Sequence, residues 1–405
     1  MRKMKDSGIE WIGEIPEGWK VTKIKHTVSS VTDIDHFMPD SVEAGIPYLM
    51  IGDLKELASS IDWNSTKKIS LEDYAKLSAK SHPQKGDIIF ARYASIGTTC
   101  YIDVSLNFLV SYACLTIRPN NLILGKFLCY YLKSPSFAED ILRKTNSNTQ
   151  GNVGKESLIN ATIILPPINE QEKIVDILDS ECSRIDAMLA KTRSSIEEYK
   201  KLKQAVITQA VTKGVRGERE MKDSGVEWIG EIPAEWSVAK AKYYVTITHG
   251  SDPKTEGSIP VYGSGAESFK TCGEYKEGPT VLIGRKGATL HIPHYIEGKY
   301  WNVDTAFDVK AKNNFSLLYY YYLATSFDYK FYIAQTTLPG MTQSNYYNMF
   351  LPFPTFPEQE EIVNYLDAKC AEIDKLIAKK EQLVKELESY KKSLIYEVIT
   401  GKREV

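Results

Sequence analysis

The chain has 405 residues, of which 43% are hydrophobic and 25% charged, with a net charge of −2. This length predicts two or three domains. The near-neutral charge excludes a strong overall attraction to nucleic acid or to an anionic membrane. The first residues, MRKMKDSGIE, carry charge without an apolar core, so we expect no signal peptide. No run reaches the ~18 apolar residues that a membrane helix needs.

Cysteine usage predicts neither a zinc site nor a disulfide scaffold. No two cysteines stand close together in the sequence, whereas a zinc cage needs clustered ligands. We therefore expect reduced thiols and a cytoplasmic location. The six positions are Cys100, Cys114, Cys129, Cys182, Cys272 and Cys370.

The opening segment of the chain occurs twice. MKDSGIEWIGEIP at 4–16 returns as MKDSGVEWIGEIP at 221–233, and 16 of 22 positions agree between 4–25 and 221–242. We call these segments the heads. Each head carries a tryptophan, Trp11 or Trp228, for which we expect either a role in closing the repeat and docking a partner or a purely structural one.

A second match follows at a different offset. NEQEKIVDILDSECSRIDAMLAK at 169–191 aligns without gaps with PEQEEIVNYLDAKCAEIDKLIAK at 357–379, an offset of 188 residues. Each half of the chain therefore has a head, a divergent middle and a similar tail, which indicates an internal duplication.

The tails predict two long helices. Asn169 with Glu172 fits a capping box and Pro357 fits a first-turn proline. Gly214 and Gly401 suit the two helix ends. About 43 residues at 1.5 Å each span roughly 65 Å.

Apolar residues recur in each tail at three heptad positions that together form one stripe. A helix with one apolar stripe needs a partner, and each tail is the natural partner of the other. The alternative is two unrelated amphipathic helices on separate cores. Met188, Leu202, Leu383 and Tyr390 belong to the third of these positions. The residues predicted to pack between the helices are Leu178, Cys182, Ile185, Leu189, Ile196, Leu366, Cys370, Ile373, Ile377 and Val384.

The two middles contain short apolar runs separated by Pro, Gly, Asn and Asp, which predicts strand-rich globular domains with some helix. The expected fold class is α+β, with two such domains joined by two long helices. The predicted division is 1–25 (first head), 26–165 (first domain), 166–214 (central helix), 215–242 (linker and second head), 243–353 (second domain) and 354–405 (C-terminal helix).

The sequence contains little that predicts catalysis. Asp40, Asp53 and Lys55 loosely match the acid, acid, lysine pattern of metal nucleases, but so short a pattern often arises by chance. A standalone nuclease remains a weak alternative. We predict a binding protein that has no catalytic residue, metal or cofactor of its own.

Two arginines stand at the ends of apolar strands beside small residues. Arg92, followed by Tyr93, and Arg285, followed by Lys286, suit the bidentate recognition of guanine O6 and N7. The alternative for each arginine is an ion pair with a local carboxylate.

Polar loops before the long helices provide further candidate DNA contacts. Asn and Gln can read adenine, while Ser and Thr can hold phosphate. Ordinary loop polarity is the alternative, and the balanced charge of both middles argues mildly against a lone high-affinity DNA binder. The candidates are Gln150, Asn152, Lys155, Thr342, Gln343, Ser344 and Asn345.

With these motifs in order and repeated, the chain resembles the specificity (S) subunit of type I restriction–modification systems. The resemblance rests on the heads, on PPINEQEKIVDILD and FPEQEEIVNYLD at the helix starts, and on AVTKG and EVITGK at their ends. GDIIFARYASIG and TVLIGRKGATL resemble the variable domains of that family.

The resemblance implies two target-recognition domains, each reading one half of a split, asymmetric DNA site, joined by two antiparallel helices. It also implies two adenine-methylating modification subunits and, where present, restriction subunits. S-adenosylmethionine and ATP with magnesium then belong to those partner subunits. The alternative from another class is a bivalent protein scaffold that reads no DNA sequence.

Overall fold

The computed structural model describes residues 2–93, 97–144, 153–265, 267–312, 314–329, 332 and 340–405. Its contacts divide the chain into two compact units. The first unit is Met1–Lys191 with Leu383–Val405, and the second is Thr192–Gln382. Each unit thus holds one head, one middle and a part of both long helices. The finer six-part division stays a prediction.

The first unit begins with a small hairpin, and β3 of its head pairs with the strand before the central helix. Its domain has an antiparallel sheet of order β4-β10-β7-β8 and a second sheet of order β6-β5-β9. The strands are β1 (Met4–Asp6), β2 (Glu14–Pro16), β3 (Lys20–Lys23), β4 (Val28–Thr32), β5 (Ile46–Leu49), β6 (Lys67–Ile69), β7 (Ile88–Ala91), β8 (Thr99–Tyr101), β9 (Leu109–Val110), β10 (Cys114–Pro119) and β11 (Thr162–Leu165). The short helices are α1 (Leu71–Ser78), α2 (Gly125–Leu132), α3 (Pro135–Lys144) and α4 (Lys155–Ile159).

The second unit repeats this plan with a different second sheet. Its main sheet has the order β15-β22-β19-β20, and the other has the order β17-β16-β21-β18. The strands are β12 (Met221–Asp223), β13 (Glu231–Pro233), β14 (Ser237–Lys240), β15 (Val245–His249), β16 (Ile259–Tyr262), β17 (Lys270–Cys272), β18 (Lys276–Glu277), β19 (Thr280–Gly284), β20 (His294–Ile296), β21 (Lys299–Asn302), β22 (Ala306–Ala311) and β23 (Phe350–Phe353). Its short helices are α6 (Leu317–Ala324) and α7 (Gln343–Asn348).

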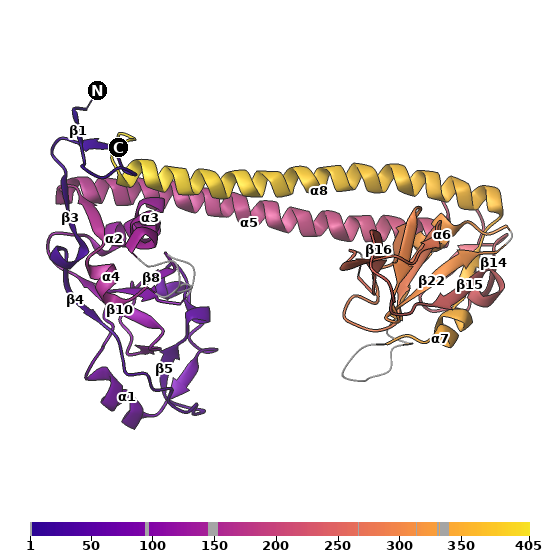
Figure 1. Ribbon diagram of the computed structural model, residues 1–405, viewed down its shortest axis with the longest axis horizontal. Coiled ribbons are helices and arrows are strands. Elements are labelled where there is room, and N and C mark those ends of the chain that lie inside the picture. Colours follow the sequence, from indigo (N-terminus) through magenta and orange to yellow (C-terminus); the bar gives the residue numbers. More distant parts are fainter. Residues whose placement is uncertain are drawn as a thin grey trace. The chain divides into compact units, whose positions relative to one another are not determined.

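Two helices are far longer than the others, α5 (Ile168–Lys213) and α8 (Phe356–Ile399). Within each unit they lie side by side (Figure 1). In the second unit Lys203 bonds to Asp374 at 2.6 Å and Lys380 lies over the Tyr199 ring, so the two helices are antiparallel. The predicted α+β fold with long paired helices is confirmed.

The residues between the helices follow the heptad pattern at two positions but not at the third. Met188, Leu202, Leu383 and Tyr390 are 42–50% exposed. A two-helix contact buries a narrow seam of two heptad positions, so these four residues of the third position face outward. At the helix starts the same position is buried in the domain cores, at Ile174 and Ile362. Of the residues predicted to pack, Ile377 and Val384 are partly buried. The others are buried, namely Leu178, Cys182, Ile185, Leu189, Ile196, Leu366, Cys370 and Ile373.

The Glu-Gln pair at the start of each long helix explains why this motif is repeated. Gln171 is fully buried; its amide oxygen accepts from Leu124 N at 2.8 Å and its amide nitrogen donates to Pro166 O at 2.9 Å. Gln359 makes the equivalent bonds with Ser316 N and Pro354 O. A buried side-chain amide that is satisfied on both sides ties each helix start to its own domain.

The glutamate of the same motif ties each helix to a head. In the second unit, Arg219 Nη1 donates to Glu358 Oε1 at 2.6 Å and Trp236 Nε1 donates to its Oε2 at 3.0 Å. In the first unit, Arg2 Nη2 and Trp19 Nε1 both donate to Glu170 Oε2. Burial raises the pKa of Glu170, but the bonds from Arg2 and Trp19 outweigh it and the net shift is downward.

Each helix ends against a head. Gly401 has φ +71°, and a Cβ at this position would lie 2.4 Å from Pro16 Cγ. Leu394 and Ile399 join Trp19 in the core of the first unit. Gly214, with φ +74°, meets Trp236 in the second unit. Glycine alone combines this backbone conformation with so close an approach.

None of the helices in the described ranges combines the length and apolarity needed to cross a membrane. All six cysteines are free and buried.

Candidate nucleic-acid interface

Each domain brings its predicted arginine next to the segment that leads to the long helix. Val153 N donates to Arg92 O at 3.0 Å, and Met341 N donates to Arg285 O at 2.9 Å. These arginines and the pre-helix segments lie far apart in the sequence, yet they meet at corresponding places in the two units. In each domain the backbone of the arginine therefore lies next to the segment that carries other candidates, and we call these neighbouring described residues the candidate cluster of that domain.

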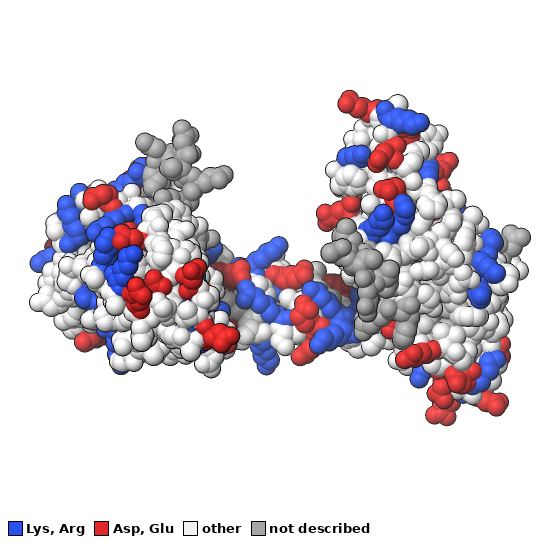
Figure 2. All heavy atoms as spheres, turned by 90° about the horizontal axis from the view of Figure 1, so that it is seen from below, with Lys and Arg blue, Asp and Glu red and all other residues white. Residues whose placement is uncertain are grey.

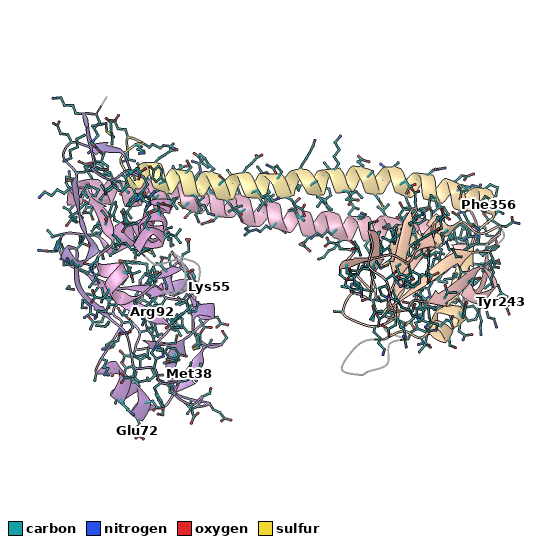
Figure 3. The ribbon with its side chains drawn as sticks, viewed as in Figure 1. Met38, Lys55, Glu72, Arg92, Tyr243 and Phe356 are labelled. Atoms are coloured by element: carbon teal, nitrogen blue, oxygen red, sulfur yellow. The ribbon has the colours of Figure 1, made fainter. Side chains whose placement is uncertain are left out.

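The Arg92 side chain is held inside the first domain (Figure 3). Its Nη1 bonds to Asp33 Oδ2 at 2.9 Å, and only 14% of the side chain is exposed. The structure thus contains the local ion pair that was the alternative interpretation. Tyr93 is 44% exposed, and the Arg92 guanidinium lies 5.8 Å from the centre of its ring. Tyr93 therefore presents the accessible surface at this position.

Arg285 is more accessible than Arg92. Its Nη1 donates to Asp304 O at 3.0 Å and approaches Asp304 Oδ2 at 3.4 Å, with 30% of the side chain exposed. Lys286 is exposed and forms a backbone bridge with Gly340. The second cluster thus presents two cations where the first presents a tyrosine.

The four candidates around α7 divide into structural and outward residues. Thr342 caps the helix by accepting from Asn345 N at 3.0 Å. Gln343 donates to Ile247 O at 2.6 Å, and the Asn345 amide donates to Tyr332 O at 3.0 Å. Ser344 is exposed at the first turn. Thr342 and Ser344 therefore offer the accessible hydroxyls of this loop.

The remaining candidates are only partly observed. Lys155 is exposed at the start of α4. Gln150 and Asn152 lie outside the described residues.

The nuclease pattern does not form a metal centre in the described part of the chain. Asp53 Oδ2 accepts from Met50 N at 2.8 Å, so this carboxylate caps its own short turn. Asp40 and Lys55 are exposed. No group of three or more His, Cys, Asp or Glu residues within the described ranges is arranged to hold a metal ion.

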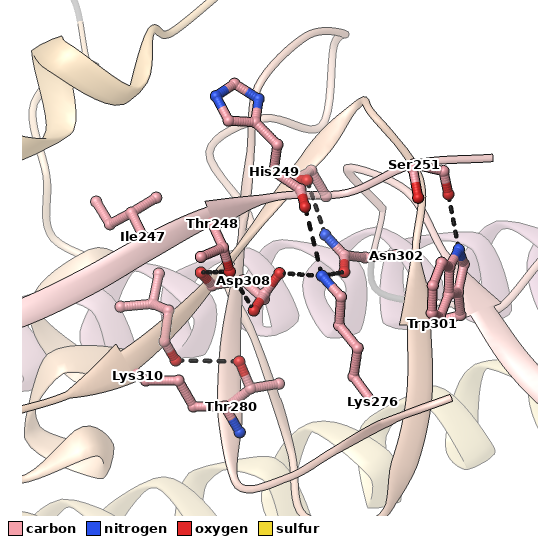
Figure 4. Close-up of polar contacts among 12 residues, drawn as sticks. Ile247, Thr248, His249, Ser251, Lys276, Thr280, Trp301, Asn302, Asp308 and Lys310 are labelled. Atoms are coloured by element: carbon pink, nitrogen blue, oxygen red, sulfur yellow. Dashed lines mark hydrogen bonds and ion pairs between the residues drawn. The ribbon is translucent and has the colours of Figure 1, made fainter. Parts of the chain in front are cut away.

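Sequence reasoning missed a buried ionic cluster in the second domain (Figure 4). Asp308 is 4% exposed, and it accepts from Lys276 Nζ at 2.5 Å and from the Thr248 hydroxyl at 2.6 Å. Lys276 also donates to the Asn302 amide oxygen at 2.8 Å. Lys276 comes from β18 and Asp308 from β22, so this cluster fastens the second sheet to the main sheet.

The first domain has hydroxyl groups at the same place. Thr32 pairs with Thr116 across β4 and β10, as Thr248 pairs with Asp308 across β15 and β22. The Ser81 hydroxyl bonds to Thr32 at 2.9 Å and to Thr116 at 3.2 Å. The two domains therefore share a sheet but fill its buried polar position with different chemistry.

Surface charge is mixed on both units. On the face drawn in Figure 2, lysine and arginine alternate with aspartate and glutamate. This pattern agrees with the balanced composition of the sequence and offers no broad basic face in that view.

The chain is an internal duplication, in which two units repeat a head, a domain and parts of both long helices. The two domains carry different side chains at corresponding places. The family model of the type I restriction modification DNA specificity domain matches residues 16–198 and again 238–386. The chain therefore belongs to this family, and it is a DNA-recognition subunit of the type I restriction–modification class rather than an enzyme.

Named relatives point to the same family. The chain is 25% identical to a protein of Methanocaldococcus jannaschii named "Putative type I restriction enzyme MjaX specificity subunit", over 96% of this chain and 95% of that one. It is also 25% identical to the EcoKI specificity subunit of Escherichia coli, over 49% of this chain and 44% of the relative.

Solved structures share the fold. One chain from a study of the assembly and conformational transition of the type I R-M system matches with a TM-score of 0.75 at 17% identity, covering 96% of this chain and 99% of that one. The HsdS subunit from Thermoanaerobacter tengcongensis matches with a TM-score of 0.52 at 17% identity, covering 96% and 98% of the two chains.

Proposed function

We propose that each domain reads one half of a split DNA site and that the two half-sites differ in sequence. The observation that carries this proposal is the contrast between the two candidate clusters. The first offers Tyr93 and Lys155, whereas the second offers Arg285, Lys286 and Ser344. Side chains of different hydrogen-bonding type select different base edges in the major groove.

The paired helices α5 and α8 act as the spacer between the half-sites. Their length is fixed by continuous backbone hydrogen bonding, and their seam keeps one register. Recognition units that face the same side of DNA need a defined separation.

The helices also dock two adenine-methylating modification subunits. Leu202 and Tyr390 occupy the same position in the two repeats, 188 residues apart, and both are 48% exposed. Large apolar side chains exposed at matching places suit two copies of one partner. S-adenosylmethionine belongs to those subunits, and ATP with magnesium belongs to restriction subunits that join the complex. The cytoplasm is the compartment where such a complex meets the chromosome.

The test is to map methylated adenines in the source cells with and without this gene. We expect one split motif, marked on both strands, to disappear when the gene is removed. An unchanged pattern in cells that express the modification subunit would contradict the proposal and favour the scaffold.

The spacer is tested separately by inserting one heptad into each helix, after Lys191 and after Gln382. Seven residues add about 10 Å of helix, or about three base pairs at 3.4 Å each. The gap between the half-sites is expected to grow by that amount while the half-sites stay unchanged. Altered half-sites with an unchanged gap would exclude the spacer role.

A further inference from the structure

In the first unit, the space between the domain and the two long helices is filled by a segment of the domain that contains Glu56. We call this place the first joint. Glu56 Oε1 lies 3.2 Å from Lys133 Nζ and 3.7 Å from Lys391 Nζ. The backbone of this segment lies along the edge of β8, where Tyr101 N donates to Glu56 O at 2.9 Å and Leu57 forms a parallel bridge with Tyr101.

The first joint balances its charges. Lys126 bonds to Asp179 at 2.5 Å and Lys391 bonds to Asp186 at 2.7 Å. With Lys133 beside Glu56, three lysines face three carboxylates. The remaining cavity measures only about 160 Å³.

The second unit contains the same joint, which we call the second joint, and here a groove of about 580 Å³ is open. Asp367 and Asp374 stand 188 residues after Asp179 and Asp186, and Lys203 stands 188 before Lys391. Lys203 bonds to Asp374 at 2.6 Å, and the Tyr322 hydroxyl donates to Asp367 at 2.5 Å, as the Tyr130 hydroxyl does to Asp179 at 2.7 Å. Both joints therefore share the two aspartates and the lysine of the long helices, together with one tyrosine from the domain.

What differs is the half of the joint that the domain supplies. Gln171 binds Leu124 in the first unit, and Gln359 binds Ser316 in the second, so Ser316 is the counterpart of Leu124 at an offset of 192 residues. By the same offset, Leu318 is the counterpart of Lys126 and Thr325 is the counterpart of Lys133. The lining of the groove comes from α5, from α6 with Thr325 just beyond it, and from α8. Among the described residues, none from the strands of the second domain takes the place of Glu56.

This replacement removes both lysines from the domain side of the second joint. Among the described residues of the groove, Lys203 bonds to Asp374 and Lys200 is paired with Glu197 at 2.9 Å. Within the described ranges, no lysine or arginine forms an ion pair with Asp367. The Tyr322 hydroxyl bonds to Asp367, whereas Lys126 supplies a cation to Asp179. A carboxylate beside an open groove attracts a cation from outside the unit.

Among the described strands, none pairs with the outer edge of the main sheet near the groove. β20 is the edge strand of the main sheet, as β8 is in the first unit. Tyr295 pairs with Val281 in the same register in which Tyr101 pairs with Ile88. Since the backbone N–H of Tyr101 points to the outer edge and donates to Glu56 O, the N–H of Tyr295 points to the outer edge too. The Tyr295 ring lies 6.4 Å from that of Tyr321, which lines the groove.

We propose that the second joint binds an extended segment of a partner protein, with the segment adding to the edge of β20 and a lysine or arginine reaching Asp367. The first joint is the template, since there an extended segment of the chain lies on the equivalent edge and Lys126 serves the equivalent aspartate. Backbone bonding at a sheet edge gives affinity, and the side chain in the groove gives selectivity.

The probe is the chain's own first-joint segment as a labelled peptide, DLKELASS (residues 53–60), and a version in which lysine replaces its glutamate. Binding of both to the full-length protein is followed by fluorescence anisotropy. We expect the lysine peptide to bind at least about tenfold more tightly, with a Kd below about 1 mM. Asp367→Asn is expected to remove this preference.

Three further variants locate the site. Leu318→Lys supplies from within the chain the cation that Lys126 gives the first joint, so it is expected to weaken peptide binding about tenfold. Ala371→Phe fills the groove and is expected to do the same without a change in charge. Glu372→Gln, on the same helix outside the groove, is the matched control and leaves binding unchanged. Equal affinity for both peptides, no saturable binding, or binding that survives Asp367→Asn and Ala371→Phe would overturn the proposal.

Discussion

The two units use the same helical contacts but different domain side chains. Glu170 and Glu358, or Asp186 and Asp374, make equivalent bonds because both helices carry them at the same positions. Glu56 and Lys126, which fill the first joint, have no such equivalents in the described part of the second unit. The duplication therefore preserves the residues that hold the helices, while the domains are free to change what they present to them.

The largest expected effect comes from the helix-start glutamates, because they test whether equivalent contacts have equal strength. The Glu358 side chain is only 2% exposed, whereas that of Glu170 is 24% exposed. Glu358→Ala leaves Arg219 without its buried partner and is expected to cost about 3–5 kcal/mol. Glu170→Ala is expected to cost about 1–2 kcal/mol. Urea unfolding followed by tryptophan fluorescence measures both, and equal losses would show that burial does not distinguish the units.

The buried polar cluster of the main sheet gives the next effect. Lys276→Met leaves Asp308 charged and without its cation, so we expect a loss of about 3 kcal/mol. Ser81→Ala removes one neutral hydroxyl from the first domain and is expected to cost about 1 kcal/mol. Adding Asp308→Asn to Lys276→Met is expected to recover part of the loss in thermal unfolding. A double variant no more stable than the single one would place the cost in lost packing instead of in the unpaired charge.

Glu56 tests the filled joint through pH. Burial raises the pKa of Glu56 and the two lysines lower it, with a net downward shift. Its stabilising effect is therefore complete above the ordinary glutamate pKa of 4.5 and is lost as the pH falls through the lower, folded-state pKa. Because the side chain is 62% exposed, Glu56→Gln is expected to cost less than about 1 kcal/mol at pH 7. The difference in Tm between the two proteins should shrink below pH 4.5, and a constant difference would contradict the ionic role.

The smallest effect on stability is expected on the outer face of the helices. Leu202→Ser and Tyr390→Ser change exposed side chains, so each is expected to alter the free energy of unfolding by no more than about 0.5 kcal/mol. Both are expected to weaken binding of the modification subunit in a titration, and to similar extents. A large loss for one variant alone would show that the two docking positions are not equivalent.

The sequence predicted the repeated parts well because their signal is local. The heptad pattern and the glycines at 214 and 401 place both long helices within a few residues of their observed ends. The strand-rich middles were also recognised, yet their sheet orders were not, because pairing between distant strands leaves no mark in a short run of residues.

The candidate site shows the same limit. Arg92 was correctly placed at the end of a strand, but its partner Asp33 lies 59 residues away, and nothing near either residue indicates that they meet. Lys276 and Asp308 look like ordinary charged residues of two separate strands. The fold brings them together in one buried cluster. In that buried place an unpaired charge costs much free energy of folding, so each residue stabilises the domain by pairing with the other.

The first unit is completed by residues from the far end of the chain. Leu394, Ile395, Val398 and Ile399 share a core with Ile12, Ile15 and Trp19. During synthesis the ribosome makes all of Thr192–Gln382 before it reaches these helix turns. The first domain to be synthesised can therefore complete its core only after the second domain has been synthesised. The two cores are completed in the reverse of the order in which the domains are translated.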